Sequence, residues 1–235
     1  MQDKPLYPMR INKYLALKQY STRRGADELI STKKVFINGK LAVLGDKVQE
    51  KDKVEVKGHS AIKNYVYYAY NKPVGVITHS PQEGEDEIKD IFPIPGVFPI
   101  GRLDKNSSGL IILTNDGRIT DKLLNPEYSH EKEYLVKTRD KIRSNFKEKM
   151  EAGVDIDGYI TKNCKVDVLN ENTFRITLTE GKKHQIRRMC VALFNEVYDL
   201  RRTRIMNIPL GRLYAGEYRP IEGKELSIFL KSLGF

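Results

Sequence analysis

The sequence predicts an α+β protein made of a small N-terminal module and a larger domain with a mixed, mostly antiparallel sheet. Strand-like and helix-like segments follow one another in an irregular order, with neither a repeat nor a regular alternation. A short polar stretch, residues 59–64, separates the two parts. Charge also divides unevenly, because residues 1–63 hold fourteen Lys and Arg against seven Asp and Glu in a chain of net charge +10.

Residues 9–58 are predicted to form two short helices followed by a small sheet. Ile11 and Leu15 give the first amphipathic helix. Ser21 is a candidate N-cap for a second helix, whose buried stripe would be Ala26, Leu29 and Ile30. Strands are predicted at 35–39 and 53–57, joined by a loop at 46–52.

Residues 65–235 are predicted to form the larger domain. Runs of aromatic, β-branched and other apolar residues predict strands at 65–71, 110–114, 132–138, 159–168 and 173–179. Helices are expected at 143–152, 182–194 and 222–230.

Several classes of function find no support in the sequence. There is no apolar run long enough for a membrane span and no secretory signal, so we expect a cytoplasmic protein without a membrane partner. Cys164 and Cys190 are far apart and outside any metal-binding spacing, which predicts reduced core residues and no metal. The usual motifs for nucleotides, zinc and catalytic triads are absent, so we expect a site without a cofactor.

The distribution of charge favours a nucleic-acid partner. Besides the basic N-terminal module, residues 181–204 hold seven Lys and Arg against two Asp and Glu, while the rest of the larger domain is slightly acidic. Two basic zones on a near-neutral body suggest a polyanion contacted at two places. A generally basic surface that only keeps the protein in solution is the alternative.

Asp104 is the first candidate for chemistry. It lies in a glycine-flanked loop, residues 101–109, just before the apolar strand predicted at 110–114. A loop held by a buried strand can aim a reactive side chain, although Asp in such a loop is also an ordinary turn former.

A second candidate segment is residues 180–189, Glu-Gly-Lys-Lys-His-Gln-Ile-Arg-Arg-Met, at the start of a predicted helix. Lys183 and Arg187 would share one helix face. If Arg187 pairs with a buried Asp104, it keeps that carboxylate ionised. Arg23 and Arg24 also stand at a helix start, where cations are unfavourable unless an anion such as a phosphate is bound; both segments could instead be solvated basic surface.

The N-terminal segment resembles the S4 RNA-binding module. The resemblance is carried by residues 9–16 (Met-Arg-Ile-Asn-Lys-Tyr-Leu-Ala), 21–30 and 35–40 (Val-Phe-Ile-Asn-Gly-Lys). It implies that Arg10, Asn12, Lys13, Arg23 and Arg24 face an RNA backbone.

The larger domain resembles the pseudouridine synthase superfamily, in the RsuA and RluB/E/F branch that carries an S4 module. Five ordered motifs carry the resemblance: Lys-Pro-Val-Gly-Val at 72–76, Phe-Pro-Ile-Gly-Arg-Leu-Asp at 98–104, residues 108–117, His-Glu-Lys-Glu-Tyr-Leu-Val at 130–136, and residues 181–189. Residues 162–166, 174–178 and 202–207 are most similar to the RluF type, which acts on large-subunit ribosomal RNA.

The resemblance implies conversion of uridine to pseudouridine without cofactor or metal. Asp104 would be the catalytic carboxylate, Arg187 its charge partner, and Tyr134 the tyrosine that stacks on the uracil. Whether Asp104 attacks C1′, attacks C6 or removes a ribose proton stays open, and Tyr134 could instead be a core aromatic of a strand. The residues predicted to contact RNA are Arg10, Asn12, Lys13, Arg23, Arg24, Arg102, Lys105, Lys183, His184, Gln185, Arg188, Arg201, Arg202 and Arg204.

The expected partner is ribosomal RNA of the large subunit, bound by a monomer. Its uridine must leave the stacked RNA to reach a pocket, and backbone contacts that weaken steeply with salt would compensate for that cost. Transfer RNA is a second candidate substrate. A non-catalytic ribosome-assembly factor and a glycosidase that releases free uracil are the alternative functions.

Overall fold

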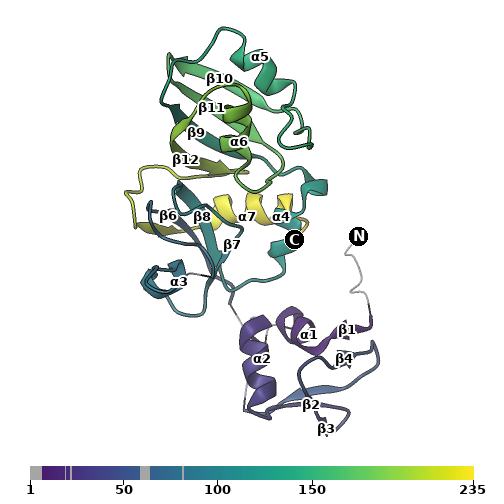
Figure 1. The fold of residues 1–235 in the computed structure, drawn as a ribbon. Helices are drawn as coiled ribbons and strands as arrows, with labels where there is room; N and C mark the ends of the chain where they lie inside the picture. The colour runs from purple at the N-terminus through teal and green to yellow at the C-terminus, as the bar shows by residue number, and fades with distance from the viewer. Residues whose placement is uncertain (1–6, 19, 22, 59–63, 81) are drawn as a thin grey trace.

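The computed structural model describes residues 7–18, 20, 21, 23–58, 64–80 and 82–235 (Figure 1). In the N-terminal module, helices α1 (Ile11–Leu17) and α2 (Arg23–Ser31) pack against each other beside a small sheet. The sheet has the order β3-β2-β5, from Lys40–Leu41, Val35–Ile37 and Val54–Val56. The predicted buried residues of both helices, Ile11, Leu15, Ala26, Leu29 and Ile30, form its core.

One detail of the module differs from the prediction, and another stays a prediction. The described part of helix α2 begins at Arg23, and Thr22, which separates it from the N-cap candidate Ser21, lies outside the described residues. The predicted loop 46–52 contains strand β4 (Lys47–Val48), which pairs with β1 (Met9–Arg10). A two-residue strand is too short to leave an alternating pattern in the sequence. Residues 59–63 of the predicted linker lie outside the described residues.

The larger domain is built on a sheet that has nine strands in the described part of the chain (Figure 1). The order is β10-β11-β9-β12-β8-β6-β14, with β7 beside β8 and β13 beside β12. All pairs are antiparallel except β12 with β8, as expected for a mixed, mostly antiparallel sheet. The strands are β6 Tyr67–Lys72, β7 Phe98–Ile100, β8 Ser108–Thr114, β9 Lys132–Thr138, β10 Lys165–Asn170, β11 Thr173–Leu178, β12 Val197–Ile205, β13 Ile208–Pro209 and β14 Tyr218–Pro220.

Helices cover this sheet over three cores, one of which contains Ile88 of α3 packed with Ile111 of β8. Phe146 and Met189 belong to a core with β9, β10 and β11, while Ile119 and Phe229 belong to another with β6 and β8. Figure 1 accordingly shows α6 over one half of the sheet and α7 over the other. The helices are α3 Ile88–Ile91, α4 Ile119–Leu124, the 3-10 turn Pro126–Tyr128, α5 Phe146–Glu151, α6 Gln185–Ala192 and α7 Gly223–Ser232. No helix in the described residues is long and apolar enough to cross a bilayer.

The two halves of the sheet meet where β8 runs parallel to β12. Gly109 lies opposite Arg202 in this pairing and has a φ of 105°. A Cβ at Gly109 would overlap the carbonyl oxygen of Arg202 and lie 2.6 Å from its nitrogen. Glycine is therefore required here by both backbone conformation and space. This junction joins the Asp104 loop to the strands that carry Tyr134 and Arg202.

Several predicted elements differ in extent. The predicted strand 159–168 begins only at Lys165, because the hydroxyl of Tyr159 and the backbone of Lys162 bind Glu180 and hold the earlier residues out of the sheet. Helices α5 and α6 are shorter than predicted at both ends. Strand β12 was not predicted, since its Asp and Arg residues interrupt the apolar pattern.

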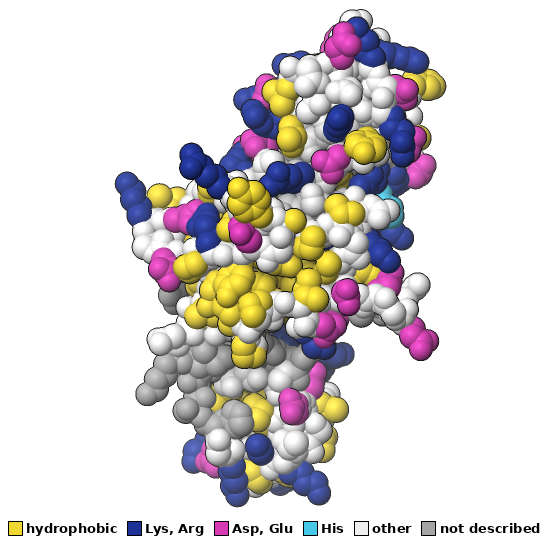
Figure 2. Space-filling view, turned by 90° about the vertical axis from the view of Figure 1, so that its left-hand side faces the viewer, with side chains coloured by type: hydrophobic (Ala, Val, Ile, Leu, Met, Phe, Trp, Pro, Cys, Tyr) yellow, Lys and Arg dark blue, Asp and Glu magenta, His cyan; other side chains and the backbone are white. Residues whose placement is uncertain are grey.

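One face of the molecule carries a mixture of charged and hydrophobic side chains. On the face in Figure 2, Lys and Arg side chains alternate with Asp and Glu, and hydrophobic side chains gather near the middle. This face therefore shows no continuous basic stripe of the kind that tracks an RNA backbone.

Candidate active site

The Asp104 loop joins β7 to β8 and is fixed at both ends. Leu103 exchanges hydrogen bonds with the Thr78 hydroxyl, which donates to its carbonyl at 2.9 Å and accepts from its amide at 3.1 Å. The Ser107 amide donates to the Asp104 carbonyl at 3.0 Å and closes a turn. The side chain of Asp104 is 37% exposed, so it is held in place yet accessible from solvent.

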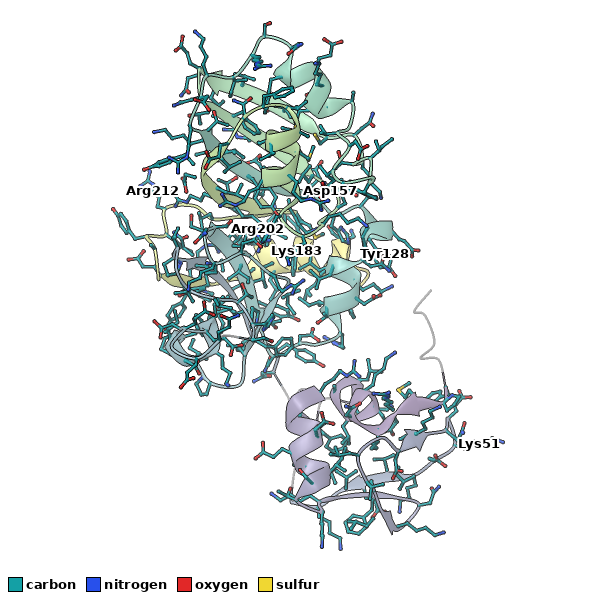
Figure 3. The ribbon with its side chains drawn as sticks, viewed as in Figure 1. Lys51, Tyr128, Asp157, Lys183, Arg202 and Arg212 are labelled. Atoms are coloured by element: carbon teal, nitrogen blue, oxygen red, sulfur yellow. The ribbon has the colours of Figure 1, made fainter. Side chains whose placement is uncertain are left out.

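Asp104 faces a cleft of about 750 Å³. Its lining includes the Asp104 loop, strands β9 and β12 and the segment before α6, together with residues 77–79, the end of β7 and helix α4. The lining residues with chemical groups of interest are Arg102, Asp104, Lys105, Lys132, Tyr134, Glu180, Lys183, His184, Gln185 and Arg202. In Figure 3, Lys183 and Arg202 lie in the same central part of the domain. The two segments singled out in the sequence therefore meet at one cleft.

The predicted ion pair between Arg187 and Asp104 is wrong in its detail. The basic group that contacts the carboxylate, in the chain as described, is His184, whose Nε2 lies 3.5 Å from Asp104 Oδ1. Arg187 binds the end of the same loop, donating to the Asn106 carbonyl at 2.7 Å and to the Ser107 hydroxyl at 3.3 Å. The reason is that α6 begins at Gln185, after His184 adopts a φ of 52°, so the basic residues do not all lie on one helix.

Tyr134 lies on β9 directly opposite Arg202 on β12. Its half-buried ring lines the cleft, and its centroid is 6.0 Å from the Arg202 guanidinium carbon. An aromatic ring in the wall of a cleft can stack on a nucleobase, and the adjacent cation favours its electron-rich face. The stacking role of Tyr134 stays a prediction.

Around the cleft, more cations are shielded from solvent than the sequence predicted. Arg202 is 4% exposed, and Lys72 is completely buried. Burial lowers the pKa of Lys72 to about 8, with the Asp104 charge acting against this shift and that of Arg202 adding to it. Burial, with a contribution from Arg202, also lowers the pKa of Lys132 to about 8.

A second carboxylate in the cleft wall, Glu180, was not assigned a role from the sequence. Burial would raise its pKa, but hydrogen bonds from Tyr159, the Lys162 amide and Gln185 lower the pKa overall. The three bonds are 2.6, 2.9 and 2.7 Å long. Glu180 therefore holds the segment before α6, and its oxygens are occupied.

The predicted RNA-contacting residues fall into two groups. Exposed or partly exposed side chains without a protein hydrogen bond in the residues described are Arg10, Lys13, Arg23, Arg102, Lys183 and Arg201. Internally bonded or ion-paired ones are Asn12, Lys105, His184, Gln185, Arg188, Arg202 and Arg204. The side chain of Arg24 lies outside the described residues. RNA contact by either group stays a prediction.

The described residues contain neither a reactive cysteine pair nor a metal-binding cluster. Cys164 and Cys190 are free thiols, and burial raises the pKa of each to about 12, as suits core residues. Among the same residues, no cluster of three or more His, Cys, Asp or Glu side chains could hold a metal ion.

Comparisons with known proteins agree with this arrangement. Residues 66–192 match the family described as RNA pseudouridylate synthase, and residues 9–54 match the S4 domain. The chain therefore belongs to the RNA pseudouridylate synthase family, as its motifs predict.

Similar proteins span nearly the whole chain. The dual-specificity RNA pseudouridine synthase RluF of Escherichia coli strain K12 is 44% identical over 93% of this chain and 77% of its own length. Ribosomal large subunit pseudouridine synthase B of Bacillus subtilis strain 168 is 34% identical over 92% of this chain and 93% of its own. A crystal structure of a pseudouridylate synthase has a TM-score of 0.70 at 29% identity, covering 96% of this chain and 99% of its own.

Arg187 gives a first test of the site. We expect Arg187→Gln to lower the single-turnover rate of uridine conversion about 100-fold, since a misplaced catalytic loop has an effect of that order. RNA affinity should stay within about threefold, because Arg187 binds the loop rather than the cleft. The control is Arg175→Gln on β11, an arginine outside the cleft. Equal rates for the two variants would show that Arg187 does not position the loop.

Proposed function

We propose that this chain converts a specific uridine of large-subunit ribosomal RNA to pseudouridine, with Asp104 as the catalytic carboxylate. The observation that carries the proposal is the placement of Asp104, held on a fixed loop and facing a cleft that also contains Tyr134 and Arg202. Breaking the glycosidic bond and rejoining the base through C5 neither adds nor removes atoms. One positioned carboxylate, with groups that hold the base, is sufficient for such an isomerisation.

The proposal requires that the uridine leave the stacked RNA. A flipped nucleotide fits the size of the cleft, and Tyr134 offers a surface for stacking. The S4 module, the exposed cations Arg102 and Lys183, and the half-buried Arg201 would hold the flanking backbone. We infer that the protein acts as a monomer in the cytoplasm, where it would meet ribosomal RNA.

Transfer RNA is a second candidate substrate. The observation that favours it is the 44% identity to a relative whose name describes it as dual-specificity. The two RNA classes share the chemistry at uridine, so the same cleft serves either one. They differ in the flanking structure that the S4 module and the cleft rim would contact.

The test is incubation of the full chain with RNA tritiated at C5 of uridine, using large-subunit, small-subunit and transfer RNA separately. Pseudouridine formation replaces the C5 hydrogen, so we expect tritium release from large-subunit RNA and pseudouridine in its nuclease digest. A glycosidase would instead release tritiated uracil, and a non-catalytic RNA-binding factor would release nothing. Either of those outcomes would overturn the proposal.

A further inference from the structure

More positive charge is withdrawn from solvent at and near the cleft than the protein itself neutralises. Arg202 and Lys72 are buried and Lys132 is half-buried, yet none of them is within 4.0 Å of a carboxylate oxygen anywhere in the described chain. The carboxylate that influences Lys72 is Asp104. Buried cations are normally paired, so an excess of them at an open cleft indicates a ligand that carries negative charge.

The hydrogen bonds show which of these cations can bind a ligand. Lys72 is occupied, because its Nζ donates to the carbonyls of Pro73 and Val76 at 2.8 Å each and it does not line the cleft. Arg202 donates through Nε to the Leu110 carbonyl at 2.6 Å and through Nη1 to the Arg102 carbonyl at 3.4 Å. Its buried Nη2 has no hydrogen-bond partner among the described residues.

Lys132, like Arg202, has hydrogen-bond donors without a partner among the described residues. Its Nζ makes one hydrogen bond, to the His130 carbonyl at 3.2 Å, and an ammonium group has three donors. Lys132 lines the cleft and lies on β9 two residues before Tyr134. Lys132 and Arg202 line the same cleft; burial lowers the pKa of Lys132 to about 8, and the charge of Arg202 adds to this shift. An anion between them would offset the repulsion between the two charges.

The reaction creates an anion of the right kind. When the bond from C1′ to N1 breaks, its electron pair stays on N1 and the base becomes a uracil monoanion, with charge shared by N1, O2 and O4. The sugar is balanced by bonding to the carboxylate or by losing a ribose proton. Attack at C6 would likewise move an electron pair toward O4. On every route open to Asp104, the pyrimidine ring carries negative charge before C5 bonds to C1′ and the C5 proton leaves.

We propose that Arg202 and Lys132 form an anion site that holds the pyrimidine base while it carries negative charge. This inference rests on the proposed function. It also changes the role of Arg202, which the sequence grouped with the RNA backbone contacts. Donors fixed before the reaction stabilise charge that develops in the transition state more than they stabilise the neutral substrate. The two residues should therefore act on the rate rather than on RNA affinity.

The test compares uridine with 5-fluorouridine at the target position of the same RNA. Fluorine withdraws electrons and makes the base a better leaving group, so it should partly replace the missing cation. We expect Arg202→Gln to slow single-turnover loss of uridine by about 10²–10³-fold, with RNA affinity changed by less than about threefold. With 5-fluorouridine, the loss should be at least about tenfold smaller.

Arg202 also binds two backbone carbonyls, so its variant could fail to fold. Lys132→Met is the second variant, since it removes one hydrogen bond, and the same dependence on the base is expected. Arg202→Lys, which retains a cation, should recover part of the rate. The matched controls are Arg175→Gln on β11 and Lys137→Met on β9, two exposed cations outside the cleft.

Each outcome decides the proposal. Equal losses on uridine and 5-fluorouridine for Lys132→Met would show a structural role and overturn it. Weaker RNA binding at an unchanged rate would show that the cations bind a phosphate, which also overturns it. If the unsubstituted chain converts neither base, the proposed function itself fails, and that result is distinct from either outcome.

Discussion

Replacing Asp104 with Asn should abolish pseudouridine formation while leaving the fold and RNA binding in place. An amide has the size of the carboxylate but can neither attack carbon nor accept a proton at neutral pH. We expect the rate to fall at least about 10⁴-fold, the order seen when a reacting residue is removed. The measurement is tritium release from C5-labelled RNA in a single turnover, together with the RNA dissociation constant.

Stability should change little in this variant. Asp104 is 37% exposed, and its ionic contact among the described residues is with His184, whose Nε2 lies 3.5 Å from Oδ1. Exposed pairs of this kind contribute about 0–1 kcal/mol. Asp167→Asn on β10 makes the same chemical change outside the cleft and should keep full activity. A rate for Asp104→Asn within about tenfold of that control would rule out the carboxylate as the reacting group.

The sequence predicted the parts of this protein that are encoded locally. Both module helices and strands such as β9 and β11 leave a pattern within a few residues, so their positions are close to those observed. The Asp104 loop was identified for the same reason, because its glycines adjoin the apolar stretch that forms β8. The motifs that indicate the family are also short and continuous.

Contacts between distant segments could not be predicted in the same way. Strand β12 is charged along much of its length, and only its place between β9 and β8 makes it a central strand. The burial of Arg202 follows from that placement, so the residue looked like a surface cation in the sequence. Arg187 was matched to Asp104 on charge alone, but the start of α6 directs it to Asn106 and Ser107.

Gly109→Ala should be the most destabilising small substitution at the site. A methyl group there would overlap the Arg202 carbonyl oxygen, and the φ of 105° is strained for any residue with a Cβ. Backbone strain of about 1–3 kcal/mol and overpacking of about 1–3 kcal/mol both apply. We expect the free energy of unfolding to fall by about 2–6 kcal/mol, which would lower Tm by roughly 10 °C in a chain of this size.

The matched control is Gly117→Ala, whose Cβ would lie 3.8 Å from the Phe98 ring and whose backbone is not in the left-handed region. Activity should fall together with stability in Gly109→Ala, because moving β12 away from β8 separates Arg202 and Tyr134 from the Asp104 loop. Thermal unfolding tests the loss of stability. Tritium release, measured at a temperature below the melting temperatures of both variants, tests the loss of activity. Equal melting temperatures for the two variants would mean that β8 and β12 do not approach closely in solution. The placement of Arg202 and Tyr134 beside the Asp104 loop would then be wrong.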